Sequence, residues 1–248
     1  MTDSSPSRIQ TERADLSRAR ILEAALREFS ENGLSGARTE QIAEAAGVNK
    51  ALIYYYFQGK EALYAAALET TAQRMVANSL RVLSLDCSAG ERLLYSALNH
   101  FDRIYSEPVF QKLMQQEMIR LTKGEPNVIS PLVETLFKPL GDKTRAVIEE
   151  GIRLGELVPV DSMQILYAAL GANVFYFLSA PMMSVMNDFK PFERPALKLR
   201  RKAAVEFLGQ ALFTDRLHGA RLAARVLAAS PMPQTIQPPT PVFPKTGE

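Results

Sequence analysis

Residues 39–60, TEQIAEAAGVNKALIYYYFQGK, decide the fold of this chain because they predict two short helices joined by a sharp turn. Thr39 can cap the first helix with its hydroxyl, and Gly47 can end it in the left-handed conformation. Asn49 can cap the next helix at once, so only residues 47–49 separate the two helices. A connection this short predicts a helix-turn-helix.

The second of these helices has two unlike faces when its residues are placed about 100° apart. Ile53 and Phe57 fall on the side that can pack against the preceding helix. A lysine can reach a phosphate or a guanine edge, tyrosine hydroxyls can bond phosphate oxygens, and an alanine permits close approach to DNA. The outward side carries residues of these kinds, namely Lys50, Ala51, Tyr54 and Tyr55. This face is typical of a helix that enters a nucleic-acid groove.

The run resembles the DNA-binding signature of the tetracycline-repressor (TetR/AcrR) family over residues 18–64. The matching positions are Thr39, Ile42, Ala43, Ala46, Gly47, Val48, Tyr54, Phe57, Lys60, Glu61 and Leu63. Asn49, Ala51 and Tyr56 stand where serine, glycine and histidine are more usual, which affects sequence preference more than the class of activity. Together, the residues and the resemblance predict DNA contacts by Arg38, Thr39, Asn49, Lys50, Ala51, Tyr54, Tyr55, Tyr56 and Lys60.

Apolar periodicity, caps and prolines predict an all-α fold, without strands, along the rest of the chain. Ser88 with Glu91 forms a capping box, Ser130 and Asp161 can each begin a helix, and Pro181 ends one. Beyond the helix-turn-helix, we expect helices over 16–32, 60–83, 88–107, 109–122, 130–154, 162–180 and 196–213.

Composition shifts divide the chain into four expected parts. Residues 1–15 form a flexible N-terminal arm, and residues 16–64 form a three-helix DNA-binding domain. A long helix joins this domain to a helical domain, residues 65–214, which the resemblance implies is a ligand-binding and dimerisation domain. Residues 215–248 form a C-terminal extension, in which 215–229 could form a short basic helix or fray. Proline enrichment predicts disorder from about residue 230 onward.

The resemblance also implies a homodimer, built as a four-helix bundle from the last two helices of the larger domain. In this chain those are residues 162–180 and 196–213. Small side chains along them would let helices approach closely, namely Ala168, Ala169, Gly171, Ala172, Ala203, Ala204, Gly209 and Ala211. Pairing would place two recognition helices about 34–36 Å apart on one face of DNA.

In the family, the larger domain also binds a small molecule. Methionine and aromatic side chains suit a pocket for varied apolar ligands, although the same residues at helical spacing can simply fill a core. His100 could hydrogen-bond a ligand. The predicted pocket residues are His100, Phe101, Tyr105, Phe110, Met114, Met118, Tyr167 and Phe175.

Composition argues against other classes of protein. Two histidines, one cysteine (Cys87) and no glycine-rich phosphate loop predict neither an enzyme, nor a metal site, nor a cofactor. The apolar run 165–180 is shorter than the roughly 20 residues that span a bilayer and contains Asn173, so we expect a buried core or interface helix and no membrane contact. Residues 1–64 hold eight basic and nine acidic residues, so a DNA-binding surface must be a local patch. We expect a bacterial cytoplasmic protein, associated with the nucleoid when bound to DNA.

These features predict a homodimeric, ligand-responsive transcriptional regulator, most simply a repressor, that binds a palindromic operator in double-stranded DNA through residues 50–57. A small apolar effector would release it from DNA. An activator uses the same parts and stays an alternative. A second alternative is a DNA-bound assembly or partner-binding protein that uses the same fold without ligand control.

Overall fold

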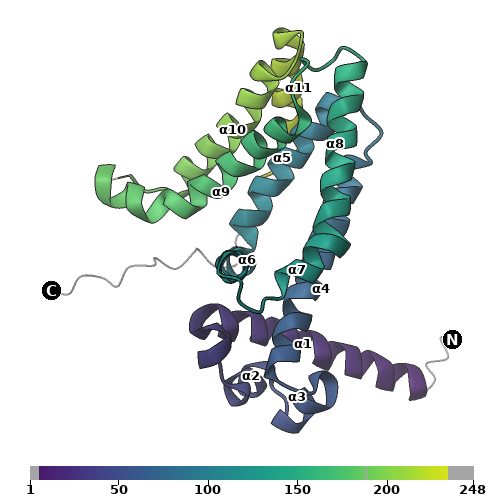
Figure 1. The fold of residues 1–248 in the computed structure, drawn as a ribbon, viewed down its shortest axis with the longest axis vertical. Coiled ribbons are helices and arrows are strands. Elements are labelled where there is room, and N and C mark those ends of the chain that lie inside the picture. The colour runs from purple at the N-terminus through teal and green to yellow at the C-terminus, as the bar shows by residue number, and fades with distance from the viewer. Residues whose placement is uncertain (1–5, 188, 234–248) are drawn as a thin grey trace. The chain divides into compact units, whose positions relative to one another are not determined.

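The helices of the chain are seen in a computed structural model that describes residues 6–187 and 189–233 (Figure 1). In this part of the chain the only strand-like pairing is an isolated bridge between Leu157 and Phe213. The all-α prediction is therefore confirmed. The helices form two compact units, and α4 (Lys60–Leu83) contributes to both, because the division falls between Met75 and Val76.

The first unit contains the predicted helix-turn-helix. Its helices are α1 (Pro6–Gly36), α2 (Thr39–Ala46), α3 (Lys50–Phe57) and the first half of α4, and residues 109–136 add α6 (Pro108–Thr122), α7 (Ile129–Leu132) and most of the π-helical turn η1 (Val133–Phe137). Its buried side chains include Ile21, Phe29, Ile42, Ile53 and Leu63. The apolar stripes of α1, α2 and α3 thus face one another, as their periodicity predicts.

The second unit consists of the end of α4, α5 (Ala89–Ser106), α8 (Lys138–Arg153), α9 (Ser162–Asn187), α10 (Arg194–Ala211) and α11 (Arg216–Ala229). One core cluster joins α5, α8, α9, α10 and α11, and Leu94, Ile148, Val205 and Val226 are fully enclosed in it. The α10–α11 crossing requires two glycines. A Cβ atom at Gly219 would lie 2.0 Å from the carbonyl oxygen of Gly209.

Several predicted caps are present as expected. Gly47 ends α2 with φ of 64°, and Gly33 interrupts α1 with φ of 67°. The hydroxyl of Ser88 accepts a hydrogen bond from the backbone N–H of Glu91 at 3.2 Å. The carboxylate of Asp161 accepts two from the first turn of α9, at 3.0 and 3.1 Å.

Other caps differ from the prediction. Thr39 is the first buried residue of α2 and not its cap, because Arg38 holds the cap position without a side-chain hydrogen bond. Ser130 does not begin a helix either. The side chain of Asn127 accepts the backbone N–H of Ser130 at 2.9 Å, so the turn is capped from three residues upstream.

The predicted helix over 130–154 is divided into α7, η1 and α8. Pro139 lies in the first turn of α8 and has no N–H to donate, so one continuous α-helix cannot pass through it without losing a backbone hydrogen bond. The opposite error occurs at Pro181, which lies inside α9 and does not end it at residue 180. At Pro181 one backbone hydrogen bond of the helix is lost, and the helix continues for about another turn and a half.

The N-terminal end of the chain is more helical than predicted, and the segment after residue 214 takes the helical form of its two predicted alternatives. The expected arm, residues 1–15, is helical from Pro6 onward, and residues 1–5 lie outside the described part. Residues 216–229 form α11, which begins at an Asp215 cap and buries Leu222, Ala223 and Val226 in the core. This helix is therefore part of the second unit and not an extension to it. The predicted disorder falls mainly on 234–248, outside the described residues.

The boundary between units also differs from the predicted one at residue 64. The first unit includes residues 109–136, which the prediction assigns to the ligand-binding domain. A buried polar contact explains the difference, since the hydroxyl of Tyr64 on α4 donates a hydrogen bond to Glu117 on α6 at 2.9 Å. The sequence contains no local signal for this contact, because its residues are 53 positions apart.

Candidate functional site

The recognition helix α3 is fixed at its start and by its inner face. The side chain of Asn49 accepts a hydrogen bond from the backbone N–H of Ala51 at 2.8 Å, which confirms the predicted cap. Ile53 and Phe57 are buried against the rest of the first unit. The opposite side is open to solvent, with Tyr54 46% and Tyr55 79% exposed. The helix therefore presents two tyrosines on a rigid support.

Lys50 lies on this open side, next to an acidic residue that the sequence analysis did not include. Its ammonium group pairs with the carboxylate of Glu40 on α2 and lies 5.6 Å from the centroid of the Tyr54 ring. The hydrogen bond that Lys50 donates to Glu40 raises the pKa of Lys50, and the same bond lowers the pKa of Glu40. Lys50 is therefore charged but partly neutralised, and DNA must compete with Glu40 for it.

Two predicted phosphate contacts already have partners in the first unit. The hydroxyl of Tyr56 donates to the backbone carbonyl of Ala14 on α1 at 3.4 Å, which occupies its only hydrogen-bond donor. The ammonium group of Lys60 donates to the carbonyls of Ser35 and Ala37 at 3.1 and 3.3 Å. An ammonium group has three donors, so Lys60 keeps one for a phosphate oxygen. Their roles on DNA stay predictions.

The remaining predicted contacts lie around the start of α2 and α3. Arg38 is exposed, and its backbone N–H donates to the carboxylate of Glu28 at 3.0 Å. Ala51 is exposed at the first turn of α3, next to Lys50. Thr39 is buried and its hydroxyl is 3.4 Å from Glu40, so its side chain is poorly placed to meet DNA. The predicted contacts with exposed side chains are thus Arg38, Asn49, Lys50, Ala51, Tyr54 and Tyr55, and the side chain of Asn49 already accepts the N–H of Ala51.

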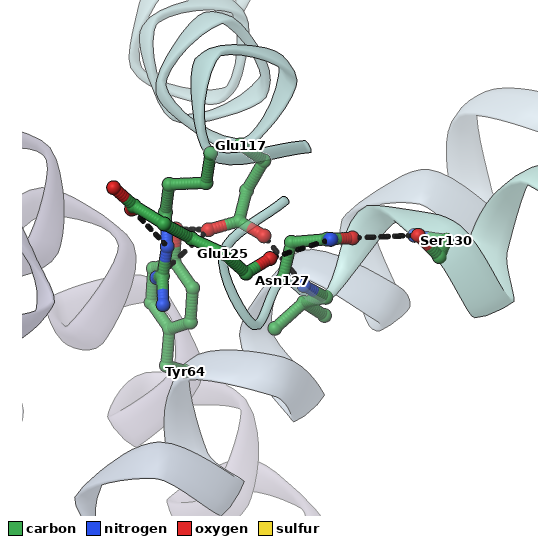
Figure 2. A network of polar contacts seen from close by, with 7 residues as sticks. Tyr64, Glu117, Glu125, Asn127 and Ser130 are labelled. Carbon is green, nitrogen blue, oxygen red and sulfur yellow. Dashed lines mark hydrogen bonds and ion pairs between the residues drawn. The ribbon is translucent and has the colours of Figure 1, made fainter. Parts of the chain in front are cut away.

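Within the first unit, a buried carboxylate on α6 connects this helix to α4 (Figure 2). Glu117 is fully buried and accepts hydrogen bonds from the hydroxyl of Tyr64 at 2.9 Å and the guanidinium of Arg120 at 3.2 Å. Its second oxygen accepts the backbone N–H of Val128 at 2.5 Å. The ring of Tyr64 packs edge-on against Phe29 of α1, with centroids 4.9 Å apart. Helices α1, α4 and α6 are therefore joined through one side chain.

The eight predicted ligand residues do not converge on one site. Phe110, Met114 and Met118 belong to the first unit, and the other five belong to the second. Phe101 and Tyr105 are buried in a small cluster with Leu197, whereas Tyr167 and Phe175 are exposed on α9. His100 on α5 has a polar contact with α9, in the same unit. Its Nδ1 atom lies 3.4 Å from the amide nitrogen of Asn173.

The comparisons with known proteins agree with the geometry of α2 and α3. A family model described as "Bacterial regulatory proteins, tetR family" matches residues 21–67. The HTH-type transcriptional regulator RutR of Escherichia coli strain K12 is 32% identical over 172 residues, which cover 67% of this chain and 76% of RutR. The chain belongs to the tetR family. It is accordingly a DNA-binding transcriptional regulator and not an enzyme.

Two further known proteins are similar to this chain over different lengths. The HTH-type transcriptional repressor NicS of Pseudomonas putida is 44% identical over 61 residues, which are 25% of this chain and 29% of NicS. A crystal structure of a gamma-butyrolactone receptor (ArpA-like protein) has a TM-score of 0.61 at 20% identity and covers 88% of this chain and 99% of its own. The latter likeness shows the fold alone.

Proposed function

We propose that this regulator is a homodimeric repressor that binds a palindromic operator through α3 and leaves it when a small effector with an apolar body binds the second unit. The observation that carries the DNA-reading part is the exposed row of Lys50, Tyr54 and Tyr55 on a helix capped by Asn49. Phosphate oxygens and base edges are the groups that such side chains bond. Its place of action is the bacterial cytoplasm.

The exposed side of α9 supports dimerisation. Residues at helical spacing along one face are open to solvent although almost all are apolar: Tyr167, Ala168, Gly171, Ala172, Phe175, Leu178, Met182, Val185 and Met186. A continuous apolar stripe of this length on a single chain marks an interaction surface. On α10, Leu199, Ala203 and Phe207 form a second exposed stripe at spacings of four residues. A second copy covering both stripes gives the predicted four-helix bundle.

The same helix needs to be considered as a membrane span. By length and composition alone, Ser162–Met186 could cross a bilayer, with 22% of its apolar window buried within the chain. However, its inner side carries Ile165, Ala169 and Asn173 against the rest of the second unit, and Asn173 bonds the carbonyl of Ala97 on α5 at 3.1 Å. We therefore assign the outer face to a second copy and not to lipid.

Two small residues have a different role from the predicted one, and the first of them, Ala169, is buried in the core cluster of the second unit. Gly209 is buried, and the space above it is filled by Gly219 and Ala223 of α11 in the same chain. Its lack of a side chain therefore serves the α10–α11 crossing and not the dimer. Ala168, Gly171, Ala172, Ala203 and Ala211 are exposed and stay available for close approach between subunits.

Release from DNA is a population shift, in which the effector prefers the conformer that cannot place both α3 helices on DNA. The bonds of Glu117 support this route, because a displacement of α6 must either move Tyr64 of α4 or break a hydrogen bond to a buried carboxylate. An effector that tightens DNA binding would instead make the protein a corepressor-dependent regulator.

The proposal is tested by incubating the purified protein with fragmented genomic DNA at physiological salt and sequencing what it retains. A few retained fragments that share an inverted repeat with half-site centres about one helical turn apart are the expected result. Broad retention without a shared motif, abolished by a modest increase in salt, would favour the DNA-bound assembly protein. Failure to retain any fragment would contradict DNA recognition by α3.

A further inference from the structure

We infer that His100 on α5 and Asn173 on α9 form the polar recognition point of the effector site, and that they bind a neutral group carrying both a hydrogen-bond donor and an acceptor, as a primary amide does. This inference rests on the proposed ligand response and specifies the chemistry of the ligand. Both residues lie in the second unit, so the site is contained within one compact body.

The first observation is a buried acceptor on Asn173. The side chain is 1% exposed, and its amide nitrogen donates to the carbonyl of Ala97 at 3.1 Å. Its Oδ1 atom is buried and has no hydrogen-bond partner among the described residues. Exchanging the two amide atoms would place an oxygen against the Ala97 carbonyl, so the orientation is fixed by that bond. A buried amide oxygen without a partner is costly and points to a ligand donor.

The second observation is a donor on His100. Its Nδ1 atom faces the amide nitrogen of Asn173 at 3.4 Å and therefore acts as an acceptor. In a neutral imidazole the proton then lies on Nε2, which makes this atom a donor. Burial, with a smaller effect of Arg103, lowers the pKa of His100 to about 3, so the ring is neutral at physiological pH.

Several other polar side chains of α4 and α5 are bonded to one another. Arg103 donates to the hydroxyl of Ser79 at 3.0 Å, and Asn78 donates to Asn99 at 2.8 Å. The amide nitrogen of Asn99 is 3.5 Å from the same Ser79 hydroxyl. The Asn173 oxygen is buried without a hydrogen-bond partner among the described residues, and with the Nε2–H of His100 it forms the pair of groups that we assign to the ligand.

Aromatic side chains lie one helical turn away on both helices. Phe101 follows Ala97 by four residues on α5, and Phe177 follows Asn173 by four residues on α9. The two rings pack with centroids 5.2 Å apart, and Tyr176 lies 6.3 Å from Phe101. An effector with an aromatic body and a polar end would match this change from polar to aromatic surroundings.

The pair favours a neutral group over an anion. A carboxylate can accept the Nε2–H of His100, but it has no proton to give to the Asn173 oxygen and would set two acceptors against each other. A ketone has the same deficiency without the charge. A primary amide supplies one donor and one acceptor, so it satisfies both groups at once.

The test is isothermal titration of the full-length protein with three compounds of nearly equal shape: benzamide, acetophenone and benzoate. Benzamide carries the donor and the acceptor, acetophenone has a methyl group in place of the donor, and benzoate is an anion. We expect benzamide to bind with a Kd of about 10 mM or tighter, a reasonable range for a fragment of this size. Acetophenone and benzoate should bind at least about ten-fold more weakly, because the Asn173 acceptor stays unpaired.

Substitutions of the two residues test whether benzamide binds at this pair. Asn173→Leu and His100→Phe should each weaken benzamide at least about ten-fold and abolish its preference over acetophenone. Asn78→Ala is the matched control, because it removes an amide from the same unit without touching the pair, and it should bind benzamide as the wild type does. If the first two variants fail to fold, the ranking of the three compounds on the wild-type protein decides the matter alone.

Acetophenone binding as tightly as benzamide would show an apolar site and overturn the inference, as would undetectable benzamide binding. Retention of benzamide by both folded variants would do the same. The titration contains no DNA, so its failure leaves operator binding in the pull-down untouched. Conversely, a protein that binds benzamide through His100 and Asn173 but retains no specific DNA would contradict the proposed function only.

Discussion

The substitution Tyr64→Phe removes a single oxygen from the contact that joins α4 to α6. In the folded protein this hydroxyl donates to Glu117, whose carboxylate is fully buried, at 2.9 Å. The ring itself stays packed against Phe29, so the loss is confined to the hydrogen bond. A hydrogen bond to a charged group contributes about 1.5–3 kcal/mol, and the buried oxygen keeps only the 3.2 Å bond from Arg120.

A loss of about 2 kcal/mol should lower the melting temperature by about 4–8 °C, because about 2–4 °C per kcal/mol is usual for a domain of this size. The assay is thermal unfolding followed by circular dichroism at constant protein concentration. Tyr55→Phe is the matched control, because it deletes the same atom from a side chain that is 79% exposed, and it should leave the melting temperature unchanged. Equal melting temperatures for the two variants would refute the view that Glu117 holds α4 and α6 together.

Three further predictions concern stability and DNA affinity. The pKa of His100 is about 3 in the folded protein, against an ordinary value of 6.5. Below pH 6.5 only the unfolded state gains this proton, so the free energy of unfolding should be about 2 kcal/mol lower at pH 5 than above pH 6.5 in chemical denaturation. His100→Phe should flatten that part of the pH profile. Gly219→Ala places a methyl group 2.0 Å from the carbonyl oxygen of Gly209 and should lower the free energy of unfolding by about 1–3 kcal/mol or more in the same assay. Gly141→Ala is the control, because a methyl group there meets no atom within 4 Å, and it should be neutral or slightly stabilising. Glu40→Gln removes the carboxylate that competes with DNA for Lys50, so operator binding measured by fluorescence anisotropy should become about two- to five-fold tighter at low salt. Weaker binding would show instead that the ion pair positions Lys50 for DNA.

Local signals in the sequence are sufficient to predict α2, α3 and the bounds of α4. The Asn49 cap, the left-handed Gly47 and the spacing of Ile53 and Phe57 each act within one or two helical turns, so their effect can be seen without the rest of the fold. Helix α4 begins and ends where expected for the same reason. The outward position of Tyr54 and Tyr55 follows directly from helical periodicity.

The features that could not be predicted from the sequence depend on contacts between distant segments. Glu40 lies in the first turn of α2, and the tight corner between α2 and α3 brings it to Lys50 ten residues later. The sequence shows Asn173 only as a polar residue within an apolar run, because its partners on α5 lie 73 and 76 residues away. Likewise, α11 has a weak apolar pattern by itself, and its place in the core follows from the glycine-mediated crossing with α10.

The central claim is that α3 reads DNA sequence through its exposed face. It is tested most directly by measuring the affinity of the wild-type protein and of Lys50→Ala and Tyr55→Ala for a retained operator fragment and for its scrambled sequence, at one salt concentration. We predict that each variant loses about 1–3 kcal/mol of operator affinity with little change on scrambled DNA, so that the specificity ratio falls. Equal losses on the two DNAs would contradict base reading by α3 and leave it a helix that only holds the phosphate backbone.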